Sequence, residues 1–539
     1  MEPDPTRGPA PVPDAATNLS DLLARASAEA GDAVAVVEAD GGRSWTWGEL
    51  EAEAGRVATG LGAAGVIAGY RVVVMLGNRL EFVSTYLGAL RTQAVVVPVN
   101  PRATPVEIAR ILADCSPRLA VVEAATAPVL RAAIEELERD YPDAVRPRLV
   151  LVDGALEPGE RSYSQLRADA AKVLPALQDP ERLAALLYTS GTTGRPRGAM
   201  LSHRALLADV DQMARVDPPM IRGDDVVLGV LPLFHVYGLN AVLGTVLHRR
   251  ARLVLVARFD AVGVLDVVAE HGCTVLPLAP PVFAQWRTIP DLRERLDGVR
   301  LVLSGSAPLS AEVVEDFVAR TGLEVHQGYG LTEAAPVVTS TLASPGASAA
   351  PGSVGAALPD VELRLVDETG RVLPPGSPDP GEVQVRGANL FSGYWPTGDD
   401  GPDAAGWWGT GDVGFLDAAG DLTLVDRLGE LIIVSGFNVY PAEVEDVVRD
   451  VPGVAEVAVI GVPDEHTGEA VVAYVRPLAG NAPYAVESAV LARCAVRLAR
   501  FKRPSRVEVV DDLPLTVTGK VQRGRLRAYE RRRATGLLE

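Results

Sequence analysis

The sequence predicts an α/β protein with a large N-terminal domain of doubly wound sheets plus a β-rich subdomain, and a small α+β C-terminal domain. Short apolar runs alternate with helix-like stretches from residue 22 to about residue 333, which indicates a largely parallel sheet with helices on its faces. Short strands and turns follow from about 340 to 425, and a smaller α+β pattern begins at Asp426. At 539 residues the chain is too long for one core, so two or more domains are expected.

The first part of the chain shows the alternation most clearly. The stretch 22–65 is expected to be helical, because Leu50, Ala54, Val57 and Leu61 recur at helix spacing. Beyond it we expect buried strands at 71–76, 94–99 and 119–123 and helices at 81–91 and 105–114, the second helix capped by Thr104. The match of 60–65 to G-x-G-x-x-G follows a helix and precedes a strand, so Gly60, Gly62 and Gly65 indicate a helix terminus and no dinucleotide site.

The same alternation continues along the rest of the chain. Strands are expected at 183–187, 226–231, 252–256, 273–277 and 299–304, with a helix beginning within 201–206. The β-rich subdomain should contain strands at 361–366, 381–386, 407–414 and 421–425. The small domain should contain strands at 431–434, 454–459 and 471–475 and helices at 441–449, 485–498 and 522–533.

Tyr188–Gly198 is the most informative stretch, with five hydroxyls and three glycines in eleven residues. It follows a buried strand, its glycines let another group approach closely, and successive N–H groups in such a turn form a concavity that binds anions. Its hydroxyls and Arg195 and Arg197 favour phosphate oxygens as the ligand. The stretch lacks the Walker A pattern.

Three more polar or glycine-rich stretches each follow a predicted strand: 232–239, 305–309 and 325–333. Ligands of open α/β sheets bind beyond the carboxyl ends of the strands. We therefore expect four separate segments to converge on one site.

Composition restricts the partners. Fifty-one basic against 70 acidic residues give a formal charge of −19, which argues against nucleic acid and anionic membrane surfaces as main partners. Cys115, Cys273 and Cys494 are too few and too far apart for a disulfide framework or a Cys-x-x-Cys metal site, and they suit a reducing, cytoplasmic setting. The proline-rich start resembles no signal peptide, residues 1–18 are expected to be a disordered tail, and no apolar run is long enough for a transmembrane helix.

Five stretches in this order resemble the adenylate-forming superfamily of acyl-CoA synthetases, nonribosomal-peptide adenylation domains and beetle luciferases. They are 188–198, 232–239, 327–333, 411–414 with 426–427, and 513–523, and the resemblance covers roughly residues 20–535. The stretch 435–445 is similar to the acyl-CoA synthetase branch, including fatty-acid–CoA ligases. After the tail at 1–18, the resemblance implies an AMP-binding domain at 19–425, a hinge at 426–429 and a mobile C-terminal domain at 430–539.

The family implies a two-step reaction with ATP, Mg²⁺ and coenzyme A. A carboxylate attacks the α-phosphorus of ATP, pyrophosphate leaves, and the acyl adenylate then transfers its acyl group to the thiol of coenzyme A. The first step moves dense negative charge, so catalysis should consist of positioning and electrostatic stabilisation.

The resemblance assigns phosphate and metal roles. The Tyr188–Gly198 loop would hold the β- and γ-phosphates through Thr189, Ser190, Gly191, Thr192, Thr193 and Gly194. Arg197 stands in this loop where relatives usually have lysine. Thr332 would bind the α-phosphate, and Glu333 would bind Mg²⁺, which prefers one or two carboxylates plus phosphate oxygens. Arginine keeps the charge but grips phosphate with a different geometry, so altered pyrophosphate release is expected.

It also implies the nucleoside contacts. Adenine would lie between Tyr329 and the 305–308 segment, which involves Gly305, Ser306, Ala307 and Gly330. Asp412 would accept hydrogen bonds from the ribose hydroxyls, and Arg427 would contact ribose or phosphate.

The C-terminal domain would act in both steps. Lys520 would offset charge at the carboxylate–phosphate junction during adenylation. Rotation about the hinge would then withdraw Lys520 and bring Ser435, Gly436 and Phe437 to a pantetheine tunnel. Gly429 and Ile433 stand where relatives carry other residues, so the balance of the two half-reactions is open.

His235 lies where the family places a residue that gates or lines the acid pocket, with Val236, Gly238 and Leu239 beside it. Further candidate pocket residues are Phe234, Pro281, Val282, Phe283 and Leu309, any of which could belong to the core instead. His203 is expected to make a helix-start contact. Fatty, aryl and short dicarboxylic acids are all compatible with the sequence, in that order of preference.

Other functions remain open at this point. The acyl adenylate could be passed to a carrier protein, or the chain could be a degenerate nucleotide-binding scaffold; the four residues Glu333, Asp412, Arg427 and Lys520 argue against the scaffold. Amino-acid activation is less favoured, because relatives that bind an ammonium supply an aspartate where this chain has His235. Patterns of serine hydrolases and zinc proteases are absent. The oligomeric state, a homodimer included, is open.

Overall fold

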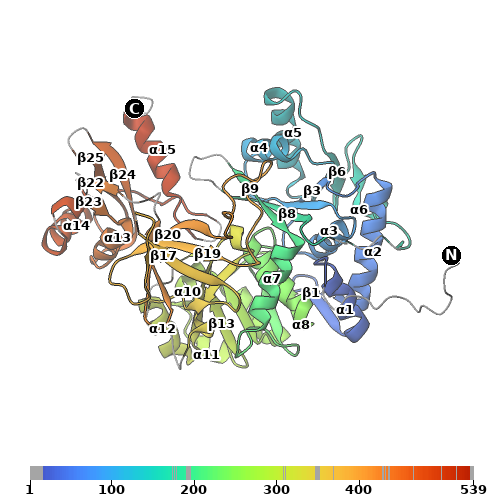
Figure 1. Cartoon of the computed structure of the whole chain (residues 1–539), viewed down its shortest axis with the longest axis horizontal. Coiled ribbons are helices and arrows are strands. Elements are labelled where there is room, and N and C mark those ends of the chain that lie inside the picture. The colour runs from blue at the N-terminus through green and yellow to red at the C-terminus, as the bar shows by residue number, and fades with distance from the viewer. Residues whose placement is uncertain are drawn as a thin grey trace.

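The computed structural model describes residues 16–534 except 173, 175–176, 178, 190–195, 308, 310, 346–351, 368, 428–429, 431, 435–436, 465–466, 499 and 517–518. Figure 1 shows the small C-terminal domain, orange to red, beside the sheet that contains β17, β19 and β20. The predicted architecture of doubly wound sheets, a β-rich sheet and a small α+β domain is confirmed.

A seven-stranded sheet has the order β7-β6-β5-β3-β4-β8-β9 and is parallel except for β9. Its strands are β3 (Arg71–Met75), β4 (Val95–Pro98), β5 (Leu119–Val122), β6 (Arg148–Leu151), β7 (Arg161–Ser162), β8 (Leu183–Thr189) and β9 (Arg197–Ser202). Alternate residues of β3 enter different cores: Val72 and Val74 pack with α2 (Trp47–Ala63) and α3 (Leu80–Arg91), and Val73 and Met75 with α4 (Pro105–Cys115) and α5 (Ala127–Asp140). These helices therefore cover opposite faces, and the short α6 (Tyr163–Leu166) follows β7.

A nine-stranded sheet has the order β16-β15-β14-β13-β12-β10-β11-β1-β2. Its strands are β1 (Val34–Glu38), β2 (Ser44–Thr46), β10 (Val226–Gly229), β11 (Arg252–Leu255), β12 (Val275–Leu278), β13 (Leu301–Ser304), β14 (Val325–Gly330), β15 (Val337–Ser340) and β16 (Ala356–Ala357). The helices that precede or connect these strands include α1 (Asp21–Ala30), α7 (His203–Ala214), the π-helix η1 (Tyr237–Gly244), α8 (Thr245–Arg249), α9 (Gly263–His271), α10 (Pro280–Trp286), α11 (Leu292–Arg295), α12 (Ala311–Thr321) and the 3₁₀ turns η2 (Thr332–Ala334) and η3 (Thr341–Ala343).

The β-rich sheet is antiparallel, with the order β18-β17-β19-β20-β21. Its strands are β17 (Glu362–Val366), β18 (Val372–Leu373), β19 (Gly381–Arg386), β20 (Trp408–Leu416) and β21 (Leu422–Arg427). One continuous apolar core includes residues of this sheet and of both larger sheets.

The C-terminal domain has apolar cores of its own. Its sheet contains β22 (Ile432–Val434), β23 (Phe437–Val439), β24 (Val454–Asp464), β25 (Gly468–Pro477) and β26 (Arg506–Val509). Its helices are α13 (Pro441–Arg449), α14 (Pro483–Arg497), the 3₁₀ turn η5 (Arg500–Lys502) and α15 (Arg523–Ala534). All three cysteines are buried free thiols.

The expectation of continuous helix over 22–65 is wrong. Two strands, β1 and β2, separate α1 from α2, because the β-branched run of β1 pairs with β11 inside the nine-stranded sheet. The helix expected to begin within 201–206 starts at His203, where the Ser202 hydroxyl accepts a hydrogen bond from the Ala205 N–H at 3.2 Å.

Gly60 and the residues just before α1 differ in detail from expectation. Gly65, with φ +81°, lies just past the end of α2 as predicted, whereas a Cβ on Gly60 would lie 1.8 Å from the Leu166 carbonyl oxygen, so Gly60 serves close packing. Thr17 and Asn18, assigned to the tail, donate hydrogen bonds to the carbonyls of Leu177 and Leu90.

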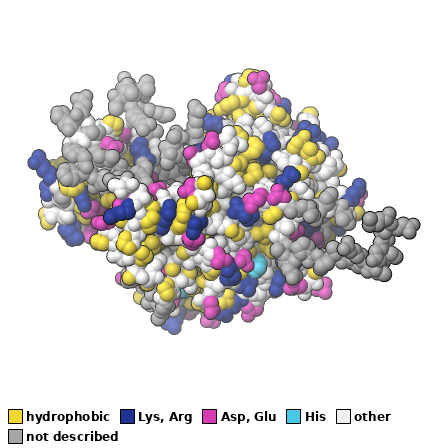
Figure 2. Space-filling view, in the orientation of Figure 1, with side chains coloured by type: hydrophobic (Ala, Val, Ile, Leu, Met, Phe, Trp, Pro, Cys, Tyr) yellow, Lys and Arg dark blue, Asp and Glu magenta, His cyan; other side chains and the backbone are white. Residues whose placement is uncertain are grey.

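Charged side chains of both signs lie interspersed over the face in Figure 2, so the acidic excess is not gathered into one patch of that face. Among the described residues, no helix combines the length and the apolar character that a membrane crossing requires.

Candidate active site

Strand direction brings together two of the four predicted segments, those that follow β13 and β14. The strands β12, β13 and β14 pair in parallel, so their carboxyl ends meet at one edge of the nine-stranded sheet. Beyond that edge lie the start of α10, the Gly305–Ala307 segment after β13, and the Thr332–Ala334 turn after β14.

The residues predicted to contact adenine and ribose lie together. The Tyr329 hydroxyl, on β14, donates a hydrogen bond to Asp412 Oδ2, on β20, at 2.6 Å, and both side chains are buried. Asp412 lies opposite Arg427 in the β20–β21 ladder, although the Arg427 side chain is outside the described residues. The β-rich sheet thus brings Asp412 to the edge of the parallel sheet, with Gly330 next to Tyr329.

Glu333 and Arg197 are joined by an aromatic side chain. The Tyr394 hydroxyl donates to Glu333 Oε1 at 2.6 Å, and the Arg197 guanidinium lies over the Tyr394 ring, 3.7 Å from its centroid. Arg197 Nη2 also donates to Asp400 Oδ2 at 2.5 Å. Burial, followed by the charge of Glu333, raises the pKa of Tyr394 above its usual value, so the phenol remains a donor.

The turn that carries Thr332 and Glu333 is hydrogen-bonded to η1, which contains part of the predicted acid-pocket segment. The Asn240 side-chain amide, in η1, donates to the Ala335 carbonyl at 2.7 Å and to the Leu206 carbonyl at 3.0 Å. Asp209, fully buried on α7, accepts the Val337 N–H at 2.9 Å, and burial raises its pKa well above the usual range. These groups fix the turn from the side of α7 and η1.

The predicted acid-pocket residues divide into two groups. Val236 and Leu239 are buried members of the main core, and a Cβ on Gly238 would lie 2.4 Å from the Pro232 carbonyl oxygen, so Gly238 permits close packing. His235 Nδ1 accepts the Tyr237 N–H at 3.3 Å, and burial lowers the pKa of His235 to about 4, so its imidazole is neutral at pH 7.

Tyr237 is the aromatic neighbour of the Gly305 segment. A Cβ on Gly305 would lie 2.9 Å from the Tyr237 ring, so the absence of a side chain at Gly305 admits that ring. Ser306, with φ +76°, and Ala307 follow Gly305. Of the other candidates, Val282 and Phe283 belong to a core cluster, and Phe283 packs edge-on against Phe317 with centroids 5.2 Å apart.

Part of the predicted phosphate and coenzyme A site falls outside the described residues. This applies to Ser190, Gly191, Thr192, Thr193, Gly194, Ser435 and Gly436, and to the side chain of Phe437. The flanks of the loop are described: Thr189 ends β8 and pairs with Arg197 of β9. His203, as expected, makes a helix-start contact, accepting the Leu19 N–H at 3.1 Å.

The loop of Lys520 touches the N-terminal domain. The Thr516 N–H donates to the Lys520 carbonyl at 2.7 Å, and the Lys520 N–H donates to Thr516 Oγ1 at 3.0 Å, which closes a tight turn. A Cβ on Gly519 would lie 2.3 Å from Cγ of Pro281, at the start of α10. The loop therefore contacts the N-terminal domain beyond β12, at the edge where the predicted nucleotide residues lie.

Sequence reasoning missed Tyr394, Asp400, Tyr237, Asn240 and Asp209. Tyr237 lies inside the 232–239 stretch, and its neighbours His235 and Gly238 could have drawn attention to it. The other four residues contact the site only through pairings distant in sequence, such as the separation of 61 between Glu333 and Tyr394.

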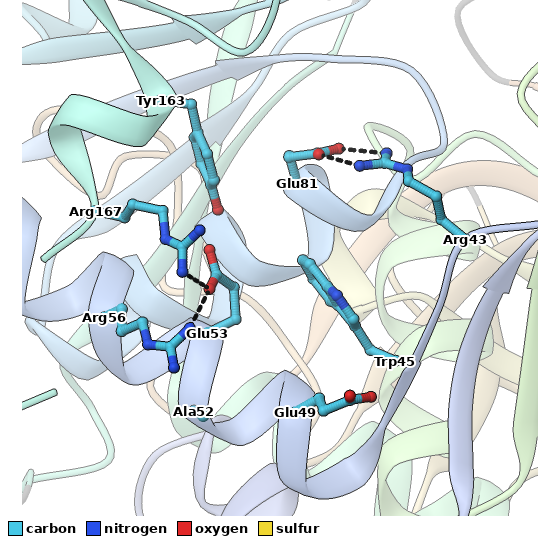
Figure 3. Close-up of a pocket in the computed structure, with 9 residues that line it drawn as sticks. All are labelled: Arg43, Trp45, Glu49, Ala52, Glu53, Arg56, Glu81, Tyr163 and Arg167. Carbon is cyan, nitrogen blue, oxygen red and sulfur yellow. Dashed lines mark hydrogen bonds and ion pairs between the residues drawn. The ribbon is translucent and has the colours of Figure 1, made fainter. Parts of the chain in front are cut away.

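A surface cavity of about 430 Å³ lies elsewhere, among β2, α2 and α6. Figure 3 shows Arg56 and Arg167 directed at Glu53, and Arg43 paired with Glu81 at 2.7 Å. Its arginine charges are therefore matched by carboxylates, and its lining contains none of the predicted site residues.

Comparison with known proteins identifies the family to which the chain belongs. The family model described as AMP-binding enzyme matches residues 23–395, and that described as AMP-binding enzyme C-terminal domain matches residues 443–520. The chain belongs to this family of AMP-binding enzymes, the adenylate-forming superfamily that includes the acyl-CoA synthetases.

Similar proteins and solved structures indicate the branch of the superfamily to which the chain belongs. The 4-coumarate–CoA ligase-like 9 of Oryza sativa subsp. japonica is 36% identical, covering 96% of this chain and 94% of that protein. ATP-bound MatB from Rhodopseudomonas palustris has a TM-score of 0.84 at 34% identity, covering 95% of this chain and 99% of that chain. A Mycobacterium tuberculosis fatty acyl CoA synthetase has a TM-score of 0.73 at 30% identity, covering 95% and 98%. The protein is an ATP-dependent, AMP-forming acyl-CoA ligase, with ATP and coenzyme A as its co-substrates.

Proposed function

We propose that this ligase activates an aromatic carboxylic acid of the hydroxycinnamate type, forms its adenylate and transfers the acyl group to coenzyme A. The observation that carries the proposal is the aromatic and neutral character of the segment after β10, where Tyr237 packs on Gly305 and His235 is uncharged at pH 7. The names of the relatives, 4-coumarate–CoA ligases at 31–36% identity, support the same substrate class. A planar ring suits a pocket with aromatic walls.

In the proposed first step, Thr332 binds the α-phosphate, and the phosphate loop with Arg197 holds the leaving pyrophosphate. Lys520 donates to the oxygens at the junction of carboxylate and α-phosphorus, where charge builds up. The contact of Gly519 with Pro281 supports this role, because it holds the lysine loop against the N-terminal domain.

Glu333 is the proposed ligand of Mg²⁺. Its carboxylate is buried and accepts one hydrogen bond through Oε1, and a carboxylate has a second oxygen that can bind a cation. The described residues contain no group of three His, Cys, Asp or Glu side chains suited to a metal ion, so the remaining ligands would be phosphate oxygens and water. When bound, the ion would offset phosphate charge.

In the proposed second step, the small domain turns about 426–429 and presents residues 435–437 to the pantetheine arm. The matched families end at 395 and begin again at 443, on either side of this hinge, which supports domains at 19–425 and 430–539. Asp426 and Arg427 form the end of β21. The three free thiols support a reducing, cytoplasmic location.

A fatty acid is the second candidate, supported by the likeness to the fatty acyl CoA synthetase of M. tuberculosis. The two candidates can be separated with purified enzyme, ATP, Mg²⁺ and coenzyme A, by measuring kcat/KM for 4-coumarate, benzoate, octanoate and palmitate through pyrophosphate release. We expect 4-coumarate to exceed either fatty acid about tenfold or more. A higher kcat/KM for palmitate would reject the aromatic assignment.

A further inference from the structure

The segment 391–400 connects the phosphate-loop strand with the Glu333 turn through main-chain hydrogen bonds. The Phe391 N–H donates to the Glu333 carbonyl at 2.8 Å, and the Trp395 N–H donates to the Gly198 carbonyl at 2.8 Å. Between them, Ser392 and Gly393 exchange hydrogen bonds with Met200 of β9. Tyr394 therefore has a fixed backbone beside both β9 and Glu333.

Three contacts fix the Tyr394 side chain. Its hydroxyl donates to Glu333 Oε1 at 2.6 Å. One face of its ring carries the Arg197 guanidinium, which Asp400 binds in turn. The Phe391 ring meets it edge-on with centroids 5.0 Å apart. Because the acceptor is a carboxylate, the bond from the hydroxyl belongs to the stronger class of hydrogen bonds.

We propose that Tyr394 is a positioning residue that fixes the Glu333 carboxylate for the magnesium ion of Mg–ATP, with Arg197 and Asp400 holding the tyrosine ring in place. This inference rests on the proposed function of Glu333 as the magnesium ligand. It assigns a role to the hydroxyl that packing alone does not need, because a phenylalanine would fill the same space between Arg197 and Phe391.

The burial of Glu333 explains why such a residue is needed. The side chain is 7% exposed, and a buried carboxylate is costly unless it is hydrogen-bonded or paired with a cation. Among the described residues, the Tyr394 hydroxyl orients the Glu333 carboxylate through Oε1, and the charge of the carboxylate would be balanced by the ion that arrives with ATP.

Arg197 has a defined part in this arrangement. Its ion pair with Asp400 is largely exposed, at 37% and 70% of the two side chains, so the pair adds little stability by itself. A planar guanidinium can lie flat on an aromatic ring and still donate to a carboxylate from its edge, which a lysine ammonium cannot do. The arginine at this position therefore supports the tyrosine ring.

The test measures ATP binding by calorimetry on the full-length protein, with neither the carboxylic acid substrate nor coenzyme A present. Binding is measured once with excess Mg²⁺ and once with excess EDTA. Tyr394→Phe keeps the ring and removes only the hydroxyl. We expect the Kd of Mg–ATP to rise about tenfold, with the Kd of metal-free ATP unchanged. In a Glu333→Gln background, Tyr394→Phe should have no further effect on either Kd.

Tyr163→Phe is the matched control, because it also removes a hydrogen-bonded tyrosine hydroxyl. The Tyr163 hydroxyl lies 2.7 Å from the Ser84 hydroxyl, at the remote cavity of Figure 3. This control variant should leave both Kd values unchanged. The inference is overturned if Tyr394→Phe binds Mg–ATP as the wild type does, or loses Mg–ATP and metal-free ATP equally. If wild-type protein binds ATP equally with and without Mg²⁺, the proposed role of Glu333 fails first.

Discussion

Replacing Gly519 with alanine probes the contact between the lysine loop and the N-terminal domain. The added Cβ would lie 2.3 Å from Cγ, 3.0 Å from Cδ and 3.7 Å from Cβ of Pro281. A separation below 3.0 Å forces one of the two groups to move. The loop would therefore be displaced from the position in which Lys520 is proposed to act.

Two costs can be separated. Gly519 has φ +81°, where an alanine costs about 1–2 kcal/mol whether or not the loop is docked. Overpacking against Pro281 costs about 1–3 kcal/mol, and only in the docked state. The second cost should lower the adenylation rate roughly 5- to 150-fold.

The assay follows the two half-reactions separately. ATP–pyrophosphate exchange reports adenylation, and thioester formation from preformed acyl adenylate reports the second step. Gly519→Ala should lower the first and spare the second. Adding Pro281→Ala removes Cγ and Cδ and leaves Cβ at the ordinary contact distance of 3.7 Å, so the double variant should recover part of the exchange rate.

A double-mutant cycle cancels whatever Pro281→Ala does by itself. A coupling energy near zero between the two substitutions would refute the claim that this contact positions the loop for adenylation. Equal loss of both half-reactions in Gly519→Ala would refute it as well.

Three further predictions concern single residues. Lys520→Ala should abolish adenylation but spare thioester formation from preformed adenylate, and equal loss of both steps would reject its assigned role. Arg197→Lys should keep the Kd of ATP within about fivefold, since one cation–π contact is worth about 0.5–1 kcal/mol, and should alter pyrophosphate release in rapid-quench assays; an unchanged release rate would make the arginine neutral. Burial lowers the pKa of His203 to about 4, so the unfolded chain takes up its proton first and stability falls as pH drops from about 6.5 to about 4. The fall in unfolding free energy from pH 7 to pH 5 should be about 2 kcal/mol smaller in His203→Asn by urea titration, and an equal fall in both proteins would contradict this.

Local patterns identified most elements of the fold. The helix Pro441–Arg449 and the strand Gly381–Arg386 match their predicted bounds, because each has a strong period and a clear start signal. The strands β1 and β2 were missed because β1 is defined by its pairing with β11, more than 200 residues later. Periodicity within 22–65 carries no information about that partner.

The candidate site also divides into residues that local motifs predict and residues that only long-range pairing places. Tyr329, Glu333 and Asp412 could be named because they lie in motifs, and the structure brings Tyr329 to Asp412. Tyr394 could not be named, since its place beside Glu333 depends on a segment that pairs with β9 across the fold. Val236 and Leu239, predicted to line the acid pocket, are buried in the main apolar core, and apolar residues after a strand have the same sequence pattern in either location.

The most direct test of the central claim is a time course of wild-type protein with 4-coumarate, ATP and Mg²⁺, analysed by mass spectrometry before and after coenzyme A is added. The proposed function predicts that 4-coumaroyl adenylate forms with pyrophosphate before the addition. It then disappears as AMP and 4-coumaroyl-CoA rise in equal amounts. Adenylate that persists unchanged with coenzyme A present, or no adenylate with any aromatic acid, would contradict the proposal.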